Sequence, residues 1–472
     1  MCYPTKLIRT LFAILLISGT ARSGELSQEI GHLMETYMEQ DLFSGVVLVG
    51  EGEEIRYERT FGKANKDFNV DNTPETKFNI ASIGKTLTAV AIMRLVEQEK
   101  IALDDSITQY IPDWPHEQIP QIRHLLSHTG GLGNYMRHPE FDAKKNTLRS
   151  LNALLALIYE EPLRFQPGTR FMYSNSGYIL LGLVIEKVTG MRYTEYVQEN
   201  IFAPAGLEHT GWYFPEEVVP NRATGYIKGI DGGFMNNSQV NLPAYSDGGT
   251  LTTAGDLFRY HVALSNEKLL SQCSKDEMFT PFFPDGNYGL GWMVDSLAGE
   301  LMIGHTGGAP GVNAEFYRFP NAKNCVVIVL SNYSHASPGV GRKISALLFD
   351  KPYEMPKPNL GEFLYTQIQT HGISHVTENL QQILKEGGYS IESDRELNIL
   401  GYQLMARNEV SSAIAIFQLN IQLFPEKANT FDSLGEAYLT AGDTLNAIKN
   451  YQETLRLNPD NLNAVQVLQR IQ

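Results

Sequence analysis

The sequence predicts an α/β protein in which one antiparallel sheet is flanked by helices, carries an inserted helical lobe and is followed by an all-α domain. Strand-like segments occur near the start and again after residue 300, with mostly helical sequence over residues 101–265 between them. A proline-rich segment at residues 351–358 then precedes helical sequence that repeats itself. The 472 residues, 43% of them hydrophobic, are enough for two or three domains with a substantial core.

The first 23 residues have the composition of a secretory signal peptide. Lys6 and Arg9 give a basic start, residues 11–19 form an apolar run, and residues 21–23 offer a cleavage point. The run is too short to span a bilayer comfortably, although an uncleaved anchor is the alternative. We therefore expect an exported protein, with the periplasm favoured, whose mature chain has no transmembrane segment.

Charge and composition exclude several classes of function. The net charge is −15 and no basic stripe is present, which argues against a nucleic-acid-binding protein. Two cysteines follow the predicted signal peptide, too few for a disulfide framework. His124 and His128 lie four residues apart without a third ligand nearby. We therefore predict neither a metal site nor a cofactor.

The first predicted domain covers residues 24–350. A buried strand at 44–50 and an alternating strand at 54–61 predict a hairpin, and the apolar segment from Ser82 to Met93 predicts a buried helix. Because early and late strands enclose a helical middle, we expect both ends of the domain to share one sheet, with a site in the cleft between sheet and lobe. The remaining predicted elements are a short helix ending in glycine (122–132), a turn (165–178), a helix (179–188), three strands (301–304, 315–319 and 325–330) and a helix (339–349).

A helical second domain is predicted over residues 361–472, after a linker at 351–360. Its clear repeats lie at about 393–472 and recur at 34 residues, which is the tetratricopeptide period. Two repeats are fewer than such arrays need, so helices over 361–386 are expected to complete the stack. Such an array would offer a site for a protein partner. The matched positions are Leu400-Gly401 with Leu434-Gly435, Ala413 with Ala447, Phe417 with Tyr451, and Pro425 with Pro459.

Ser82 and Lys85 form an S-x-x-K pair at the start of the predicted buried helix. Residues three apart share a face of a helix, which puts the Lys85 amine beside the Ser82 hydroxyl. A lysine in a dry site can lose its proton and then accept that of the serine, which would make Ser82 a nucleophile. Ser265 and Lys268 repeat this spacing without other support, and we interpret them as a solvated helix end.

Tyr173 and Asn175 lie at a predicted turn before a helix, where side chains can point into a cleft. A tyrosine near a lysine can carry protons between a nucleophile and a leaving group. An asparagine at this place can hold a substrate amide or the lysine. A buried tyrosine and a helix-capping asparagine explain the same pattern equally well.

His-Thr-Gly occurs twice, at residues 128–130, which we interpret as a loop, and at 305–307, after a predicted short strand. At the second copy, Gly307 and Gly308 would let a substrate lie against the strand edge, with backbone N–H groups facing an oxyanion. His305 would then be a polar group at the wall of the cleft. A lone histidine is more often a satisfied structural residue.

The ordered set Ser82-x-x-Lys85, Tyr173-x-Asn175 and His305-Thr306-Gly307 resembles the serine β-lactamase and penicillin-binding protein superfamily. The resemblance covers about residues 25–350. It is strongest to the branch of class C β-lactamases, D-alanyl-D-alanine carboxypeptidases, D-aminopeptidases and related esterases. It implies a β-lactamase-like fold and an acyl-enzyme formed on the serine.

The resemblance also implies roles for three further side chains. Lys85 and Tyr173 would share proton transfer, and which of the two is the base stays open. Asn175 would position the amide on the acyl side of the substrate.

The resemblance implies that backbone N–H groups of Ser82 and Gly308 form the oxyanion hole. His305 and Thr306 would bind the leaving side of the substrate or its carboxylate, with Gly307 among the substrate-binding residues. Many β-lactamases carry lysine where His305 stands, and a neutral histidine is a weaker carboxylate anchor than lysine near neutral pH. This departure lowers the expectation of efficient β-lactam hydrolysis.

We therefore expect an exported serine hydrolase that acts on D-amino-acid peptides or on small esters and amides. A β-lactamase is the alternative within enzymes. An alternative of another class is a catalytically weak scaffold that uses the repeat domain to bind a protein. The presence of Ser82, Lys85 and Tyr173 argues against the scaffold.

Overall fold

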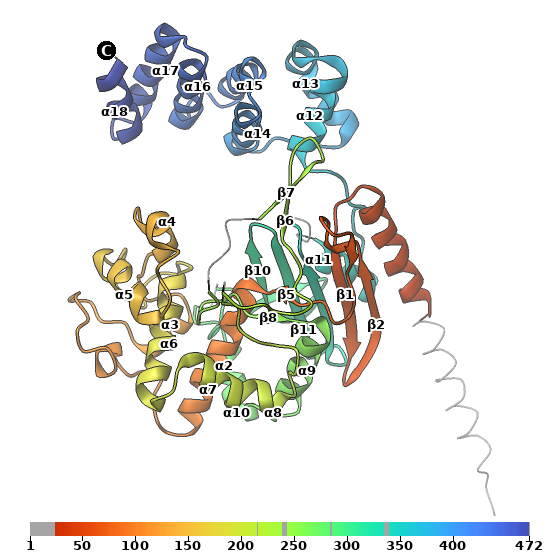
Figure 1. Cartoon of the computed structure of the whole chain (residues 1–472), viewed down its shortest axis with the longest axis vertical. Helices are drawn as coiled ribbons and strands as arrows, with labels where there is room; N and C mark the ends of the chain where they lie inside the picture. Colours follow the sequence, from red (N-terminus) through yellow and green to blue (C-terminus); the bar gives the residue numbers. More distant parts are fainter. Residues whose placement is uncertain (1–23, 215, 238–242, 284–285, 335–338, 472) are drawn as a thin grey trace, which may run out of the picture. The chain divides into compact units, whose positions relative to one another are not determined.

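The computed structural model (Figure 1) describes residues 24–214, 216–237, 243–283, 286–334 and 339–471, and the predicted signal peptide at residues 1–23 lies outside them. The chain divides into two compact units. The first reaches Ile227 and resumes at Met235–Pro356, and the second comprises Lys228–Phe234 and the chain from Lys357 onward. Within the described residues, every helix is too short or too polar to cross a membrane.

The first unit is built on a six-stranded sheet in which all neighbouring strands are antiparallel. The order across the sheet is β2-β1-β12-β11-β10-β9, so strands from both ends of the unit pair side by side. The α/β fold with one antiparallel sheet is confirmed. The strands are β1 (Gly45–Glu51), β2 (Glu54–Phe61), β9 (Met293–Leu297), β10 (Glu300–Ala309), β11 (Val312–Phe319) and β12 (Cys325–Ser331).

Both faces of the central strands β1 and β12 are buried, which explains their unbroken apolar runs. Val46 and Leu48 pack in the core cluster shared with helices α2 (Gly84–Glu97) and α9 (Ala254–Ser265). The alternate residues of β1 pack in a second cluster with α11 (Val340–Leu348) and with a helix at residues 24–39. The sequence analysis did not predict the helix at 24–39, whose buried Ile30, Leu33, Met34 and Tyr37 follow the helical period.

An inserted lobe fills the chain between β2 and β9. As predicted, α2 is buried nearly all round, and it packs against α6 and α7 of the lobe. The helices are α3 (Ile122–Leu126), α4 (Phe141–Lys144), α5 (Leu151–Glu160), α6 (Asn175–Thr189), α7 (Tyr193–Val197), a π-helix (Gln198–Phe202), α8 (Ala203–Ala205) and α10 (Gln272–Met278), with 3-10 turns η1 (Ala81–Ile83), η2 (Ile107–Gln109) and η3 (Tyr135–Arg137). Short paired strands are β3 (Lys63–Asn65) with β4 (Val70–Asp71), β5 (Phe78–Asn79) with β8 (Leu251–Thr252), and β6 (Tyr226–Lys228) with β7 (Phe234–Asn236).

The second unit is helical apart from residues 228–234, and its helices recur at 34 residues. The bounds of α14 and α15 recur in α16 and α17, since 394 + 34 = 428 and 410 + 34 = 444. A Cβ on Gly401 would lie 2.4 Å from Phe417, and one on Gly435 would lie 3.2 Å from Tyr451, so each glycine faces the matching aromatic ring. The helices are α12 (Leu360–His371), α13 (Ile373–Gly387), α14 (Asp394–Ala406), α15 (Val410–Leu423), α16 (Ala428–Thr440), α17 (Thr444–Leu457) and α18 (Leu462–Ile471).

Three boundaries near the predicted site differ from the sequence analysis. β10 runs through the second His-Thr-Gly, so His305 lies within a strand and not after one. Gly307 and Gly308 remain extended because they pair with Ala314 and Asn313 of β11. α3 ends at Leu126, before the first His-Thr-Gly, and α6 begins four residues earlier than predicted, at Asn175 and not at 179.

Candidate active site

Ser82 and Lys85 meet at the junction of η1 and α2. Ser82 lies in the 3-10 turn, and Lys85, in the first turn of α2, is fully buried. The Lys85 ammonium donates to Ser82 Oγ at 3.2 Å and to the Asp247 backbone oxygen at 2.5 Å. Because the amine is out of water and fixed by two acceptors, its position beside the hydroxyl is set by the fold.

The turn that carries Ser82 is held from both sides. Ala81 has φ of 42°, a left-handed conformation that is unfavourable for a residue with a Cβ. Its N–H donates to Asn79 Oδ1 at 2.7 Å, and its oxygen accepts from the Gly249 N–H at 3.2 Å. A Cβ on Gly307 would lie 2.1 Å from the Ile80 oxygen, so β10 lies directly against this turn.

A cleft of about 670 Å³ opens at Ser82. Tyr173, His305, Thr306 and Gly308 line it together with Ser82, and Lys85 lies behind the serine. Neither Gly307 nor Asn175 belongs to the lining: Gly307 packs on the turn, and Asn175 Nδ2 donates to Met136 Sδ at 3.4 Å. The other lining residues are Ser127, Phe171, Phe282, Phe283, Gly286, Asn287, Tyr288 and Met293.

Tyr173 is 38% exposed, and its ring centroid lies 5.1 Å from Lys85 Nζ. No hydrogen bond joins its hydroxyl to Ser82 or Lys85 within the described residues. The next residue, Ser174, is the N-cap of α6 and accepts from the Gly177 N–H at 3.2 Å. The cap therefore comes from the serine between the two predicted residues and not from Asn175.

The first His-Thr-Gly, interpreted as a loop from sequence, also reaches the site. His128 is 2% exposed, and its ring contacts that of Tyr173 at a tilt of 39°, with ring centroids 4.2 Å apart. Its Nδ1 accepts from the Ser174 N–H at 3.1 Å, and its Nε2 lies 3.2 Å from Tyr288 Oη. Tyr288 Oη lies 2.8 Å from His305 Nε2.

His305 Nδ1 lies 2.6 Å from the Thr306 backbone oxygen, so both ring nitrogens of His305 have partners inside the protein. Burial, with the positive charge of Lys85, lowers the pKa of His305 to about 3. The same two causes lower the pKa of His128 well below its ordinary value. Both imidazoles are therefore neutral at physiological pH.

Sequence reasoning missed His128, Tyr288 and Asp247. The signal for His128 was the repeated His-Thr-Gly. Asp247 carried no signal, because its backbone oxygen reaches Lys85 from 162 residues away. The Asp247 carboxylate is buried and accepts from Tyr135 Oη at 3.0 Å. Burial raises the pKa of this carboxyl, and Lys85 opposes the rise.

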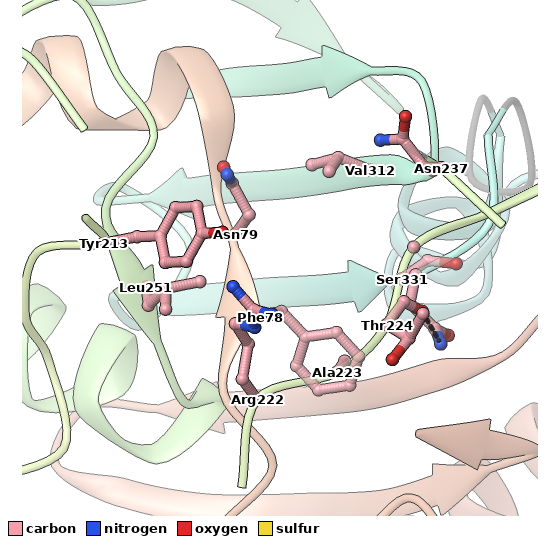
Figure 2. Close-up of a pocket in the computed structure, with 13 residues that line it drawn as sticks. Phe78, Asn79, Tyr213, Arg222, Ala223, Thr224, Asn237, Leu251, Val312 and Ser331 are labelled. Carbon is pink, nitrogen blue, oxygen red and sulfur yellow. Dashed lines mark hydrogen bonds between the residues drawn. The ribbon is translucent and has the colours of Figure 1, made fainter. Parts of the chain in front are cut away.

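A second, smaller cavity of about 110 Å³ borders β5, just before the Ser82 turn, and shares no lining residue with the first. Figure 2 shows Asn79, Tyr213 and Arg222 around it. The Arg222 guanidinium carbon lies 4.5 Å from the Tyr213 ring centroid, a stacked cation–π arrangement.

Three potential metal ligands lie close together at the surface of the lobe. Ligand atoms of His138, Glu140 and Glu160 fall within 4.8 Å of one another. His138 Nε2 lies 3.2 Å from Glu160, and Glu140 pairs with Lys144. Contacts within the protein account for these distances, and exposed acidic groups commonly gather without a metal.

The fold and the serine–lysine pair in its cleft define a class of protein, the serine hydrolases that place an S-x-x-K motif between an antiparallel sheet and a helical lobe. The sequence model of one family, described as Beta-lactamase, matches residues 29–349. The chain belongs to this family.

Relatives of this family cover most of the first unit. The chain is 30% identical over 349 residues to Penicillin-binding protein 4* of Bacillus subtilis, covering 69% of this chain and 76% of the relative. The crystal structure of a penicillin-binding protein from Bacillus halodurans superposes with a TM-score of 0.60 at 33% identity, covering 67% of this chain and 99% of the other. An octameric penicillin-binding protein homologue from Pyrococcus abyssi gives 0.61 at 26% identity, covering 75% and 81%.

Proposed function

We propose that this serine hydrolase forms an acyl-enzyme on Ser82 and acts on D-amino-acid peptides or on small esters and amides. Ser82 Oγ attacks the carbonyl, and Lys85 and Tyr173 carry protons to and from the serine and the leaving group. Backbone N–H groups of Ser82 and Gly308 face the oxyanion. The contact between the buried Lys85 Nζ and Ser82 Oγ, with Ser82 lining the cleft, is the observation that carries this proposal.

The character of the cleft favours this class of substrate over β-lactams. His305 stands where many β-lactamases carry lysine, and both of its nitrogens are bonded within the protein. Aromatic side chains and Met293 give the cleft a mainly apolar surface, so an apolar acyl or leaving group would be desolvated there. A carboxylate-bearing β-lactam would find no added cation among the described lining residues.

A labelling experiment with a substrate panel tests the proposal. The mature protein and its Ser82→Ala variant would be treated with a fluorophosphonate probe and assayed with nitrocefin, D-alanyl peptides, D-amino-acid amides and short esters. We expect labelling and turnover of an ester or a D-configured amide in the wild type, and neither in Ser82→Ala. Labelling that persists in the variant would mean that the nucleophile is another residue. Fast turnover of nitrocefin alone would identify a β-lactamase.

We propose that the second unit is a tetratricopeptide array that binds a protein partner, and that the chain is exported to the periplasm. Helix bounds that repeat at 34 residues, with a glycine under an aromatic ring in each repeat, support the array. The exported location rests on the sequence of residues 1–23 and is tested by fractionating cells that express the whole chain.

A further inference from the structure

The proton positions along the pair of histidines follow from two backbone groups. The Ser174 N–H can only donate, so His128 Nδ1 accepts and the neutral ring carries its proton on Nε2. The Thr306 oxygen can only accept, so the His305 proton is on Nδ1 and its Nε2 accepts. Tyr288 Oη, between the two rings, must then accept from His128 and donate to His305. One arrangement of protons satisfies these four contacts; Tyr178, whose hydroxyl donates to the Leu126 oxygen, lies against Tyr288 Oη as well.

We infer that Tyr288 is a positioning residue of the hydrolase proposed above, whose hydroxyl fixes both imidazoles as complementary neutral tautomers and so gives substrate an uncharged wall beside Tyr173. The inference rests on the proposed function. Tyr288 itself lines the cleft but is only 7% exposed, and its hydroxyl bonds to the two histidines. His128, held by this bond, contacts the ring of Tyr173 and limits where that phenol can lie.

The surroundings of the two rings keep them uncharged. Lys85, Tyr173, Tyr178 and Tyr288 are the titratable groups that face them, and no carboxylate does so in the described part of the chain. A proton added to His305 would go on Nε2 and displace the Tyr288 hydroxyl proton. A proton added to His128 would go on Nδ1 and displace the Ser174 N–H. Either proton would also meet the positive charge of Lys85.

The hydrogen bonds of His305 indicate which leaving groups this wall can accommodate. With no nitrogen of His305 available, a leaving group that carries a carboxylate gains no hydrogen bond there. Phe171, Phe282 and Met293 add apolar surface to the same cleft. The site therefore takes neutral leaving groups, and the hydroxyl of Tyr288 enforces that preference.

Tyr288→Phe tests the inference in the full-length protein. It leaves both imidazoles in place but frees His305 Nε2 to take up a proton. We expect kcat/KM for a neutral ester to fall about tenfold at pH 7.5, as for the loss of one buried hydrogen bond. We also expect an acid limb at higher pH than any in the wild type, because His305 Nε2 loses the donor that favours the neutral ring, although burial and Lys85 still oppose a proton there. Below that limb the ratio of neutral to anionic substrate turnover should fall.

Two variants assign the acid limb. In Tyr288→Phe combined with His305→Gln the limb should vanish, because the titrating ring is gone. Tyr260→Phe is the matched control: it removes a hydroxyl from a buried tyrosine of α9 that stacks on Trp292 and Phe316 and makes no ring contact with either histidine among the described residues. Its pH profile should match the wild type. A Tyr288→Phe enzyme that loses only thermal stability and keeps the wild-type profile would overturn the inference.

Nitrogen-15 spectra of histidine-labelled protein give a readout that does not need activity. At pH 7 we expect His128 as the Nε2–H tautomer and His305 as the Nδ1–H tautomer, with both signals shifted in Tyr288→Phe. Finding His305 charged, or in the other tautomer, would overturn the inference even if Ser82 is the nucleophile. Correct tautomers without any Ser82-dependent turnover would instead remove the proposed function and the catalytic part of this inference.

Discussion

At the scale of single residues, burial decides which of the two S-x-x-K pairs can do chemistry. Lys85 is enclosed by the fold and donates to Ser82. The single Ser265 hydroxyl proton, by contrast, is shared between the His261 oxygen and Asn324 Oδ1, and Ser265 Oγ accepts from Arg318, so this hydroxyl is used within the protein. Its partner Lys268 lies on the exposed surface.

Lys85→Ala and Tyr173→Phe should each reduce the rate of acylation by roughly 10²–10⁴, the range for a positioned acid or base. The rate is measured as the second-order constant for fluorophosphonate labelling at Ser82. Ser265→Ala is the control and should label at the wild-type rate, with a lower midpoint of thermal unfolding because its hydrogen bonds are lost. A Ser265→Ala variant that no longer labels would reverse the choice between the two pairs.

At the scale of elements, the close approach of β10 to the serine turn sets the geometry of the cleft. The strand can lie against Ile80 and Ala81 only where it lacks a side chain, and Gly307 is the residue at that point. Its neighbour Gly308 faces open space on the cleft side. Adjacent glycines of one strand therefore have opposite surroundings, as the pleat requires.

Gly307→Ala should separate β10 from the turn, because its Cβ would lie 2.1 Å from the Ile80 oxygen. We expect labelling of Ser82 to fall at least a hundredfold, with a lower unfolding midpoint. Gly308→Ala meets no atom within 4 Å and should fold like the wild type, so that any change appears in KM. The measurements are the rate of Ser82 labelling and the midpoint of thermal unfolding for Gly307→Ala and Gly308→Ala. Equal loss of stability in the two would contradict the packing argument.

The elements near the site show what sequence could predict. β1 and the buried α2 follow from apolar runs that need only local pattern. The strand predicted at 301–304 is shorter than β10 because glycine disfavours strands when only local sequence is considered. In the fold, pairing with β11 keeps Gly307 and Gly308 extended. Ser82 and Lys85 are near in sequence, so their contact was derivable. The link from His128 to Tyr288 joins residues 160 apart and depends on tertiary packing that one sequence does not reveal.

At the scale of the whole molecule, buried titratable groups give opposite contributions to stability in acid. Burial, with Arg318, lowers the pKa of His261 well below its ordinary value, so below about pH 6.5 the unfolded chain binds a proton that the native state does not. The stability that the neutral, buried His261 contributes above about pH 6.5 is therefore lost as the pH falls. Burial raises the pKa of Glu315 to about 7, and its contribution is present in acid and lost as pH rises through 7.

His261→Gln and Glu315→Gln should therefore change the pH dependence of stability in opposite directions between pH 5 and 6.5. His261→Gln should make the loss of stability in acid shallower by up to about 1.4 kcal/mol per pH unit, and Glu315→Gln should make it steeper. Urea unfolding followed by tryptophan fluorescence measures this, because Trp114, Trp212 and Trp292 all belong to the first unit. Slopes that change in the same direction would refute the assignment.

Removing residues 357–472 should leave activity on a small ester within about twofold, since every residue of the cleft precedes them. The truncated chain should nevertheless aggregate, because Ile230 belongs to the second unit and is 4% exposed in its apolar cluster. Ile230→Ser in the truncated chain should restore solubility, measured by light scattering and ester turnover. Inactivity of a folded, soluble truncation would show that the helices shape the cleft.

The membership of residues 228–234 in the second unit also has a consequence during translation. Ile230 leaves the ribosome 134 residues before Leu364 of its own cluster, since 364 − 230 = 134. At roughly 5–20 residues per second this interval lasts about 7–27 s. During this interval Ile230 cannot pack against Leu364, and Lys228 cannot form its ion pair with Glu362, which measures 3.0 Å in the folded protein. A nascent chain therefore presents Ile230 to chaperones without its apolar partners for this interval.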